Sequence, residues 1–293
     1  MRSLTEDRIA LWRNAIRQFN IHKETEGVFH KAGYRHFEIE HELKNSKEET
    51  IKPDIVGWGE RADSENNDFY FTLELTLNDK TKKEQLAKYS NAEPDVFRVF
   101  GIQSKKAPDV LLGVSQYVSN NEGYCQLIFG ETLDVKFVDN IRDGELREAL
   151  SCSIGMELKE IPEISFRILP ESKGGEIRRG IVASILRAFG PENGDISAAE
   201  VMEEALDILF EHTGADERKN LTVRISNEID VLVEKHLQEY IEKVSEGKYR
   251  LTEKGKAVHK TPNSRSAVES KLNEWMKQKQ SALHSFSEFA PDS

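Results

Sequence analysis

Two carboxylates on neighbouring predicted strands are the side chains of this sequence best placed to do chemistry. Asp54 follows a proline at the start of a strand expected over 52–58, and Glu74 lies in FYFTLELTL, a strand expected over 69–77. Alternation puts Glu74 on one face with threonines and the apolar residues on the other. Close carboxylates repel unless a cation compensates them, and their hard oxygens suit Mg²⁺ or Mn²⁺. The pair therefore predicts a metal site for phosphoryl chemistry, with an ordinary half-solvated strand as the alternative.

A helix expected over 80–91 adds polar side chains beside this pair. Gln85 and Tyr89 are four residues apart, so they share a helix face. Lys82 is three residues before Gln85 and shares that face too. The helix therefore presents an amide, a phenol and an ammonium group together.

The order of these motifs resembles that of a nuclease superfamily. The residues that carry it are Asp54, then Glu74, Leu75 and Thr76, then Gln85 and Tyr89. Together they resemble the PD-(D/E)xK, restriction-endonuclease-like nucleases, and Gln-x-x-x-Tyr is similar to the element of their RecB-like exonuclease branch. The resemblance covers about residues 20–130. It implies a Mg²⁺- or Mn²⁺-dependent phosphodiesterase.

The resemblance also implies roles for individual residues. Asp54 and Glu74 would be metal ligands, and the Leu75 backbone carbonyl would be a third. Gln85 and Tyr89 would contact the nucleic-acid backbone or orient the site. The superfamily often has a further glutamate on its first core helix, where Glu26 is preferred over Glu24; the alternative for Glu26 is a solvated helix charge.

Thr76 departs from the superfamily, whose members usually have a lysine at this position. A threonine hydroxyl can hydrogen-bond a water molecule but supplies no positive charge. Three interpretations stay open. The lysine function has moved, to Lys82 or to Lys52, which shares the parity of Asp54; the site works with the hydroxyl alone and more slowly; or the site is degenerate and only binds.

Composition places the chain among water-soluble proteins with two domains. It has 293 residues, 32% of them charged, and a net charge of −11. That charge argues against a general nucleic-acid coat or a binder of anionic membranes. Two cysteines without a C-x-x-C motif suggest a reducing, cytoplasmic setting. No signal peptide and no 18-residue apolar stretch is seen, so no membrane association is expected.

The pattern of elements changes near PESKGGE, which suggests a domain boundary. Residues 1–170 are expected to form a mixed-sheet α/β domain and residues 171–261 a mainly helical one. Residues 262–293 are expected to be a polar linker with a short helix. The predicted fold class is thus α/β, a restriction-endonuclease-like core followed by an α+β winged-helix domain.

The second domain resembles a winged helix over roughly residues 176–260. Helices are expected over 176–190, 197–212 and 220–238, followed by a hairpin over 240–252. Its expected nucleic-acid contacts are Arg218, Lys219, Arg224, Lys248 and Arg250. The region from 173 to 261 has 14 Lys and Arg against 17 Asp and Glu, a net of −3, whereas DNA readers are usually basic. A salt-bridged surface or a protein-binding role stays open.

The function predicted from the sequence is metal-dependent cleavage of DNA, with the winged helix choosing the target or partner. By analogy, such a protein would act in restriction, phage defence or a mobile element. One alternative is a catalytically degenerate DNA-binding or assembly subunit, and another is a transcriptional regulator with an α/β sensor domain. DNA is the expected partner, and a protein partner or a homodimer is left open.

Overall fold

The computed structural model describes residues 4–19, 26–44, 47, 49–59, 69–77, 83–90, 107–158, 166–189, 194–260 and 270. The chain divides into two compact units. The first is Met1–Ile164 with Glu211–Gly214, and the second is Ser165–Phe210 with Ala215–Ser293. The division differs from a single boundary at residue 170 because a short later segment returns to the first unit. None of the described helices has both the length and the apolar character needed to cross a membrane.

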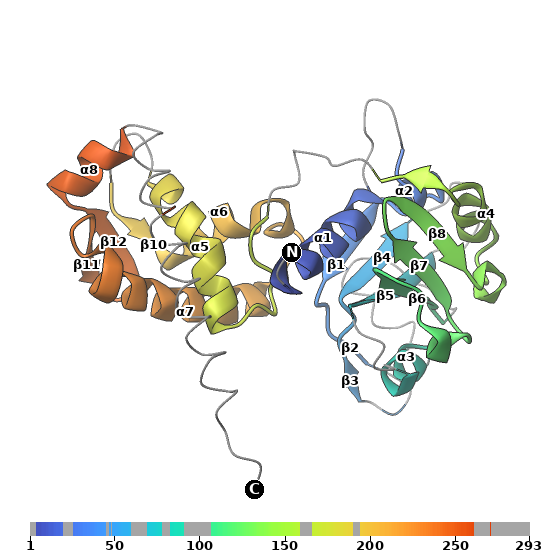
Figure 1. Ribbon diagram of the computed structural model, residues 1–293. Coiled ribbons are helices and arrows are strands. Elements are labelled where there is room, and N and C mark those ends of the chain that lie inside the picture. The colour runs from blue at the N-terminus through green and yellow to red at the C-terminus, as the bar shows by residue number, and fades with distance from the viewer. Residues whose placement is uncertain are drawn as a thin grey trace, which may run out of the picture. The chain divides into compact units, whose positions relative to one another are not determined.

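A seven-stranded mixed sheet forms the centre of the first unit (Figure 1). In spatial order its strands are β1 (His36–Ile39), β4 (Ile55–Gly59), β5 (Phe69–Thr76), β6 (Asp109–Val114), β7 (Cys125–Phe129), β8 (Thr132–Lys136) and β9 (Met156–Glu157). Strands β5, β6 and β7 are mutually parallel, and the other neighbouring pairs are antiparallel. The predicted mixed α/β character is confirmed.

Helices pack on both faces of this sheet. They are α1 (Leu4–Arg17), α2 (Val28–Lys31), α3 (Lys83–Tyr89) and α4 (Gly144–Cys152), with 3₁₀ turns at Ser119–Asn121 and Val138–Asn140. On one face, the ring of Phe29 from α2 lies 4.6 Å from the ring of Phe71 in β5. On the other, Leu86 and Tyr89 of α3 belong to one apolar cluster with Tyr70. Because Tyr70 and Phe71 point to opposite faces of β5, α2 and α3 cover opposite sides.

A small hairpin separates β1 from β4. It consists of β2 (Leu43–Lys44) and β3 (Thr50–Ile51), whose Leu43 and Ile51 join the cluster under α3. The sequence pattern predicts one strand over 36–43, but β1 ends at Ile39 because Glu40 adopts a left-handed backbone with φ of 54°. The interruption ends β1 at the level of Asp54, whose backbone oxygen accepts from the Glu40 N–H at 3.0 Å.

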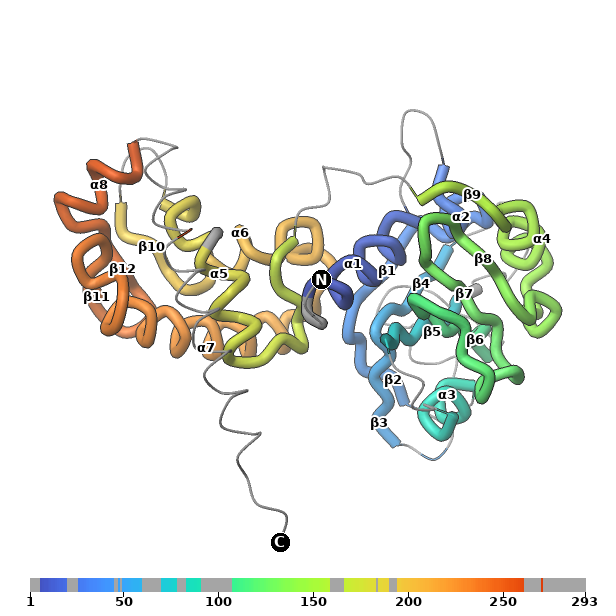
Figure 2. The backbone as a smooth tube through the Cα atoms, viewed as in Figure 1, coloured from blue at the N-terminus to red at the C-terminus, as the bar shows by residue number. Residues whose placement is uncertain are grey.

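The second unit combines helices with a three-stranded antiparallel sheet in the order β10-β12-β11 (Figure 2). Its elements are α5 (Gly174–Ala188), β10 (Ile196–Ser197), α6 (Ala198–Leu206), a 3₁₀ turn at Asp207–Leu209, α7 (Ala215–Leu232), a π-helical turn at Val233–Leu237, β11 (Ile241–Ser245), β12 (Lys248–Leu251) and α8 (Glu253–His259). The predicted hairpin is confirmed, and Gly247 takes the left-handed conformation in its turn, with φ of 65°. Strand β10 was not predicted.

Helical periodicity accounts for the core of the second unit. Residues at three- and four-residue spacing are buried on α5 (Ile177, Ile181, Ile185) and α7 (Leu221, Ile225, Ile229, Leu232). Helix α6 begins at a capping box in which Ser197 and Glu200 bond each other's backbone N–H groups. It ends at Leu206, earlier than the predicted residue 212, because Asp207 has φ of 51°. The predicted helix near Trp275 lies outside the described residues.

Candidate functional site

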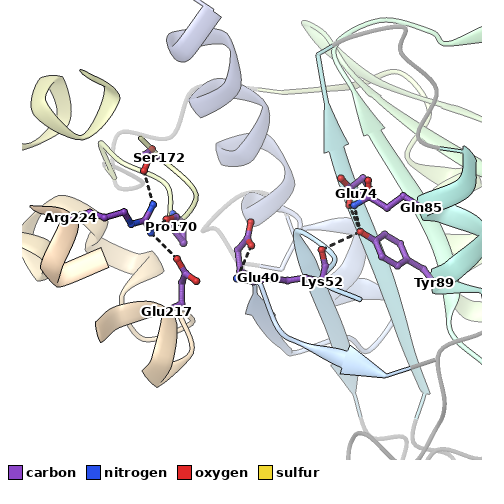
Figure 3. A network of polar contacts seen from close by, with 9 residues as sticks. All are labelled: Glu40, Lys52, Glu74, Gln85, Tyr89, Pro170, Ser172, Glu217 and Arg224. Carbon is purple, nitrogen blue, oxygen red and sulfur yellow. Dashed lines mark hydrogen bonds and ion pairs between the residues drawn. The ribbon is translucent and has the colours of Figure 1, made fainter. Parts of the chain in front are cut away.

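Glu74 is a buried carboxylate beneath α3. It lies on the α3 face of β5 and is only 1% exposed. The Tyr89 hydroxyl donates to Glu74 Oε2 at 2.7 Å, and the Gln85 amide donates to the same oxygen at 3.2 Å (Figure 3). The sequence pattern also allowed a half-solvated face, but α3 covers it. Gln85 and Tyr89 therefore act, in this structure, as direct partners of Glu74.

The Tyr89 hydroxyl lies between Glu74 and the backbone of Lys52. It is 3.1 Å from the Lys52 carbonyl oxygen and also accepts a hydrogen bond from Gln85 (Figure 3). Burial raises the pKa of Tyr89 well above its ordinary value, and the charge of Glu74 raises it further. Tyr89 thus keeps its proton and remains a hydrogen-bond donor across the physiological pH range.

Asp54 is placed beside Glu74 by the register of two antiparallel strands. Ile55 of β4 pairs with Leu73 of β5, so the same register continued by one residue sets Asp54 opposite Glu74. Asp54 Oδ2 accepts the backbone N–H of Leu75 at 2.6 Å. Strand β4 begins only at Ile55. The Asp54 carboxylate, just before it, therefore accepts the Leu75 N–H in place of a backbone carbonyl.

Leu75 completes the set of oxygen atoms expected at this position. The N–H and C=O of one strand residue point toward the same neighbouring strand. Since the Leu75 N–H is bonded by Asp54, its carbonyl lies on the Asp54 side of β5. Two carboxylates and one carbonyl fit a hard cation such as Mg²⁺ or Mn²⁺, which retains water in its other positions. Within the described ranges, no group of three or more His, Cys, Asp or Glu could hold a metal.

The structure does not bring Glu26 to this pair. Its carboxylate contacts His30 Nδ1 at 2.5 Å, and its side chain is 44% exposed. Gly27 separates it from α2, the helix on the Phe71 face of the sheet, whereas Glu74 lies on the α3 face. The expectation that Glu26 is a metal ligand is therefore corrected: Glu26 lies before α2 rather than on it, and its carboxylate pairs with His30.

Comparisons with protein-family models, with curated proteins and with solved structures found no match.

Lys52 and Lys82 are the two lysines expected to supply positive charge near Asp54 and Glu74 in place of a lysine at position 76. Thr76 ends β5 on the same face as Glu74 and is partly exposed. Lys82 lies outside the described residues. The Lys52 ammonium is 3.2 Å from Glu40 Oε2 and, in Figure 3, extends toward Glu40 rather than toward Glu74. Glu40 was not singled out in the sequence, because only the left-handed turn after β1 brings it to Lys52.

The basic residues predicted to contact nucleic acid are largely engaged within the second unit. The Arg224 guanidinium donates to the carbonyls of Ser172 and Pro170, at 2.8 and 2.5 Å, and to Glu217 at 2.8 Å (Figure 3). This group ties α7 to the loop before α5. Its assignment as a phosphate contact is therefore replaced by a structural role.

The other residues predicted to contact nucleic acid differ in how many bonds they form within the protein. Arg250 forms two hydrogen bonds with Asp195, at 2.6 and 2.9 Å. Arg218 donates to the Phe210 carbonyl at 3.3 Å and lies over the Phe210 ring. Lys219 is 3.3 Å from Asp216, and Lys248 is exposed on β12. Of the five residues, Lys219 has a side chain that is 79% exposed.

Proposed function

We propose that the first unit is a restriction-endonuclease-like nuclease domain that hydrolyses phosphodiester bonds of DNA with Mg²⁺ or Mn²⁺. The observation that carries the proposal is the meeting of Asp54 and Glu74 beside Gln85 and Tyr89, from two strands and the following helix. The succession of three antiparallel strands (β1, β4, β5), a helix and a parallel strand β6 also agrees with that superfamily.

In this proposal, each residue of the site has its own role in catalysis. Asp54, Glu74 and the Leu75 carbonyl would hold the ion, which supplies activation of water and stabilisation of developing charge when bound. Tyr89 and Gln85 fix the Glu74 carboxylate by two hydrogen bonds, so the carboxylate keeps one orientation. The Thr76 hydroxyl can hydrogen-bond a water molecule on the same face. The second unit, which we assign to the winged-helix class from its order of helices and strands, would select the target or partner.

A second candidate function is binding of nucleic acid without cleavage. Two observations favour it: Thr76 stands where the superfamily has lysine, and the Lys52 ammonium is paired with Glu40. A cation near the attacking water stabilises charge that develops only in the transition state, so its loss lowers turnover more than binding.

Plasmid and linear DNA incubated with Mg²⁺ or Mn²⁺ distinguish these two functions. We expect the wild type to cleave, and Lys82→Ala to lower kcat by roughly 10²-fold with little change in DNA affinity if Lys82 supplies the charge. Thr76→Lys should then partly restore cleavage, because position 76 shares the face of Glu74. Normal cleavage by Lys82→Ala excludes Lys82 and makes Lys52→Ala the next variant. An inactive wild type that Thr76→Lys activates would assign the natural protein to the binding function.

A further inference from the structure

A groove lies between α7 and the β11–β12 hairpin of the second unit. It has a volume of about 540 Å³ and is open to solvent. Asn227 and Asp230 line it from the helix, and Lys243, Val244 and Glu246 line it from the hairpin. None of these residues belongs to the candidate metal site.

Hydrogen bonds connect the helix wall of the groove to the hairpin wall. Tyr249 of β12 is fully buried, and its hydroxyl lies 2.9 Å from Asp230 Oδ1 and 3.1 Å from the Ser226 carbonyl on α7. Lys243 of β11 donates to Asp230 Oδ2 at 2.7 Å. Because these bonds already fix the hairpin against the helix, a ligand would not have to order the walls, which lowers the cost of binding.

Two aliphatic side chains are exposed along this face. Val223 is 61% exposed and precedes Asn227 by one helical turn, so it lies on the same face of α7 as the groove. Val244 is 42% exposed and lines the groove itself. These two valines add apolar surface beside the charged residues of the groove.

The charge of the groove is negative. The hydrogen bond from Lys243 to Asp230 raises the pKa of Lys243, and the nearby carboxylates of Glu246 and Glu234 raise it further. The charged residues that line the groove are thus two carboxylates, Asp230 and Glu246, and one ammonium group, Lys243, a net charge of −1. Such a surface repels phosphate and attracts lysine and arginine.

We propose that this groove docks a basic segment of a partner protein, with an aliphatic side chain of that segment against Val223 and Val244. A lysine or arginine side chain of the segment pairs with Glu246, the lining carboxylate on the hairpin. DNA is the poorer fit because the ammonium group among the lining residues, that of Lys243, is already paired with Asp230, and the other lining charge is the Glu246 carboxylate. The proposal is independent of the proposed nuclease function.

Selection from a phage-displayed random peptide library, with the full chain as bait, tests this proposal. We expect the enriched peptides to be basic and to contain an aliphatic residue. A synthetic copy should bind the wild type, more weakly as salt is raised, and at least tenfold more weakly to Val244→Lys and to Glu246→Lys. Glu204→Lys on α6 and Ile154→Lys in the first unit are matched controls, because both residues are exposed and outside the groove. Both variants should bind the peptide as tightly as the wild type.

Several results would overturn the proposal. These are no enrichment, enrichment of peptides that are not basic, or unchanged binding by the Val244 and Glu246 variants. Weaker binding of a DNA duplex by Asn227→Asp would instead make the groove a nucleic-acid surface. A dimer that Val244→Lys dissociates, seen by sedimentation, would make a second copy of the chain the occupant.

Discussion

Glu74→Gln is expected to lower metal-dependent DNA cleavage by at least about 10²-fold, the scale of losing one electrostatic stabiliser of the transition state. Glutamine has the size of glutamate, and its carbonyl oxygen can still accept from Tyr89 and Gln85. The change therefore removes the negative charge and leaves the surrounding packing in place. DNA affinity should stay the same or rise, because a carboxylate that repels phosphate has been neutralised. Cleavage rates and DNA affinities measured side by side separate the two effects.

Glu84→Gln is the matched control for this substitution. Glu84 is an exposed carboxylate on α3, the helix that carries Gln85 and Tyr89. Its removal changes the net charge by the same amount without touching the site, so cleavage should be normal. Equal cleavage by Glu74→Gln and the wild type would show that any nuclease activity resides elsewhere.

Arg224→Ala is expected to destabilise the second unit by about 1.5–3 kcal/mol, the range for hydrogen bonds that involve a charged group. The substitution leaves the carbonyls of Pro170 and Ser172 and the Glu217 carboxylate without the guanidinium that binds them. These partners are partly shielded from water, and Ser172 is 4% exposed, so water replaces the lost donors incompletely. Urea denaturation measures the free energy of unfolding, and the salt dependence of DNA binding should be unchanged.

Lys219→Ala on the same helix is the comparison. The Lys219 side chain is 79% exposed and its ion pair with Asp216 is 3.3 Å long, so its removal should change stability by less than about 0.5 kcal/mol. If Arg224→Ala unfolds at the same urea concentration as the wild type and instead lowers the salt slope of DNA binding, Arg224 is a phosphate contact after all.

Local periodicity predicted the elements that carry the site. The alternation in FYFTLELTL fixed which residues share the face of Glu74, and the four-residue spacing fixed that Gln85 and Tyr89 lie together on a helix. Their contacts with Glu74 follow from these two periods once α3 packs on that face. The hairpin β11–β12 was predicted from two short strand segments around a Ser-Glu-Gly-Lys turn.

Contacts between segments distant in the sequence determine the partners of Lys52 and Arg224, which local patterns could not predict. The pairing of Lys52 with Glu40 depends on a left-handed residue at the end of β1, and a glutamate gives no local signal for that conformation. Arg224 has the appearance of a surface charge on an amphipathic helix, but its partners come from a loop about 50 residues earlier. Strand β10 has only two residues, too few for a periodic pattern.

Titration with Mn²⁺ tests the central claim, a divalent-metal site between Asp54 and Glu74, most directly. Calorimetry on the wild type should show saturable binding of Mn²⁺. Asp54→Asn and Glu74→Gln should each weaken it strongly, because each removes one charged oxygen ligand while keeping the side-chain volume. Glu84→Gln should bind Mn²⁺ like the wild type. Equal affinity for Mn²⁺ in the wild type and in both site variants, or no binding by the wild type, would contradict the claim.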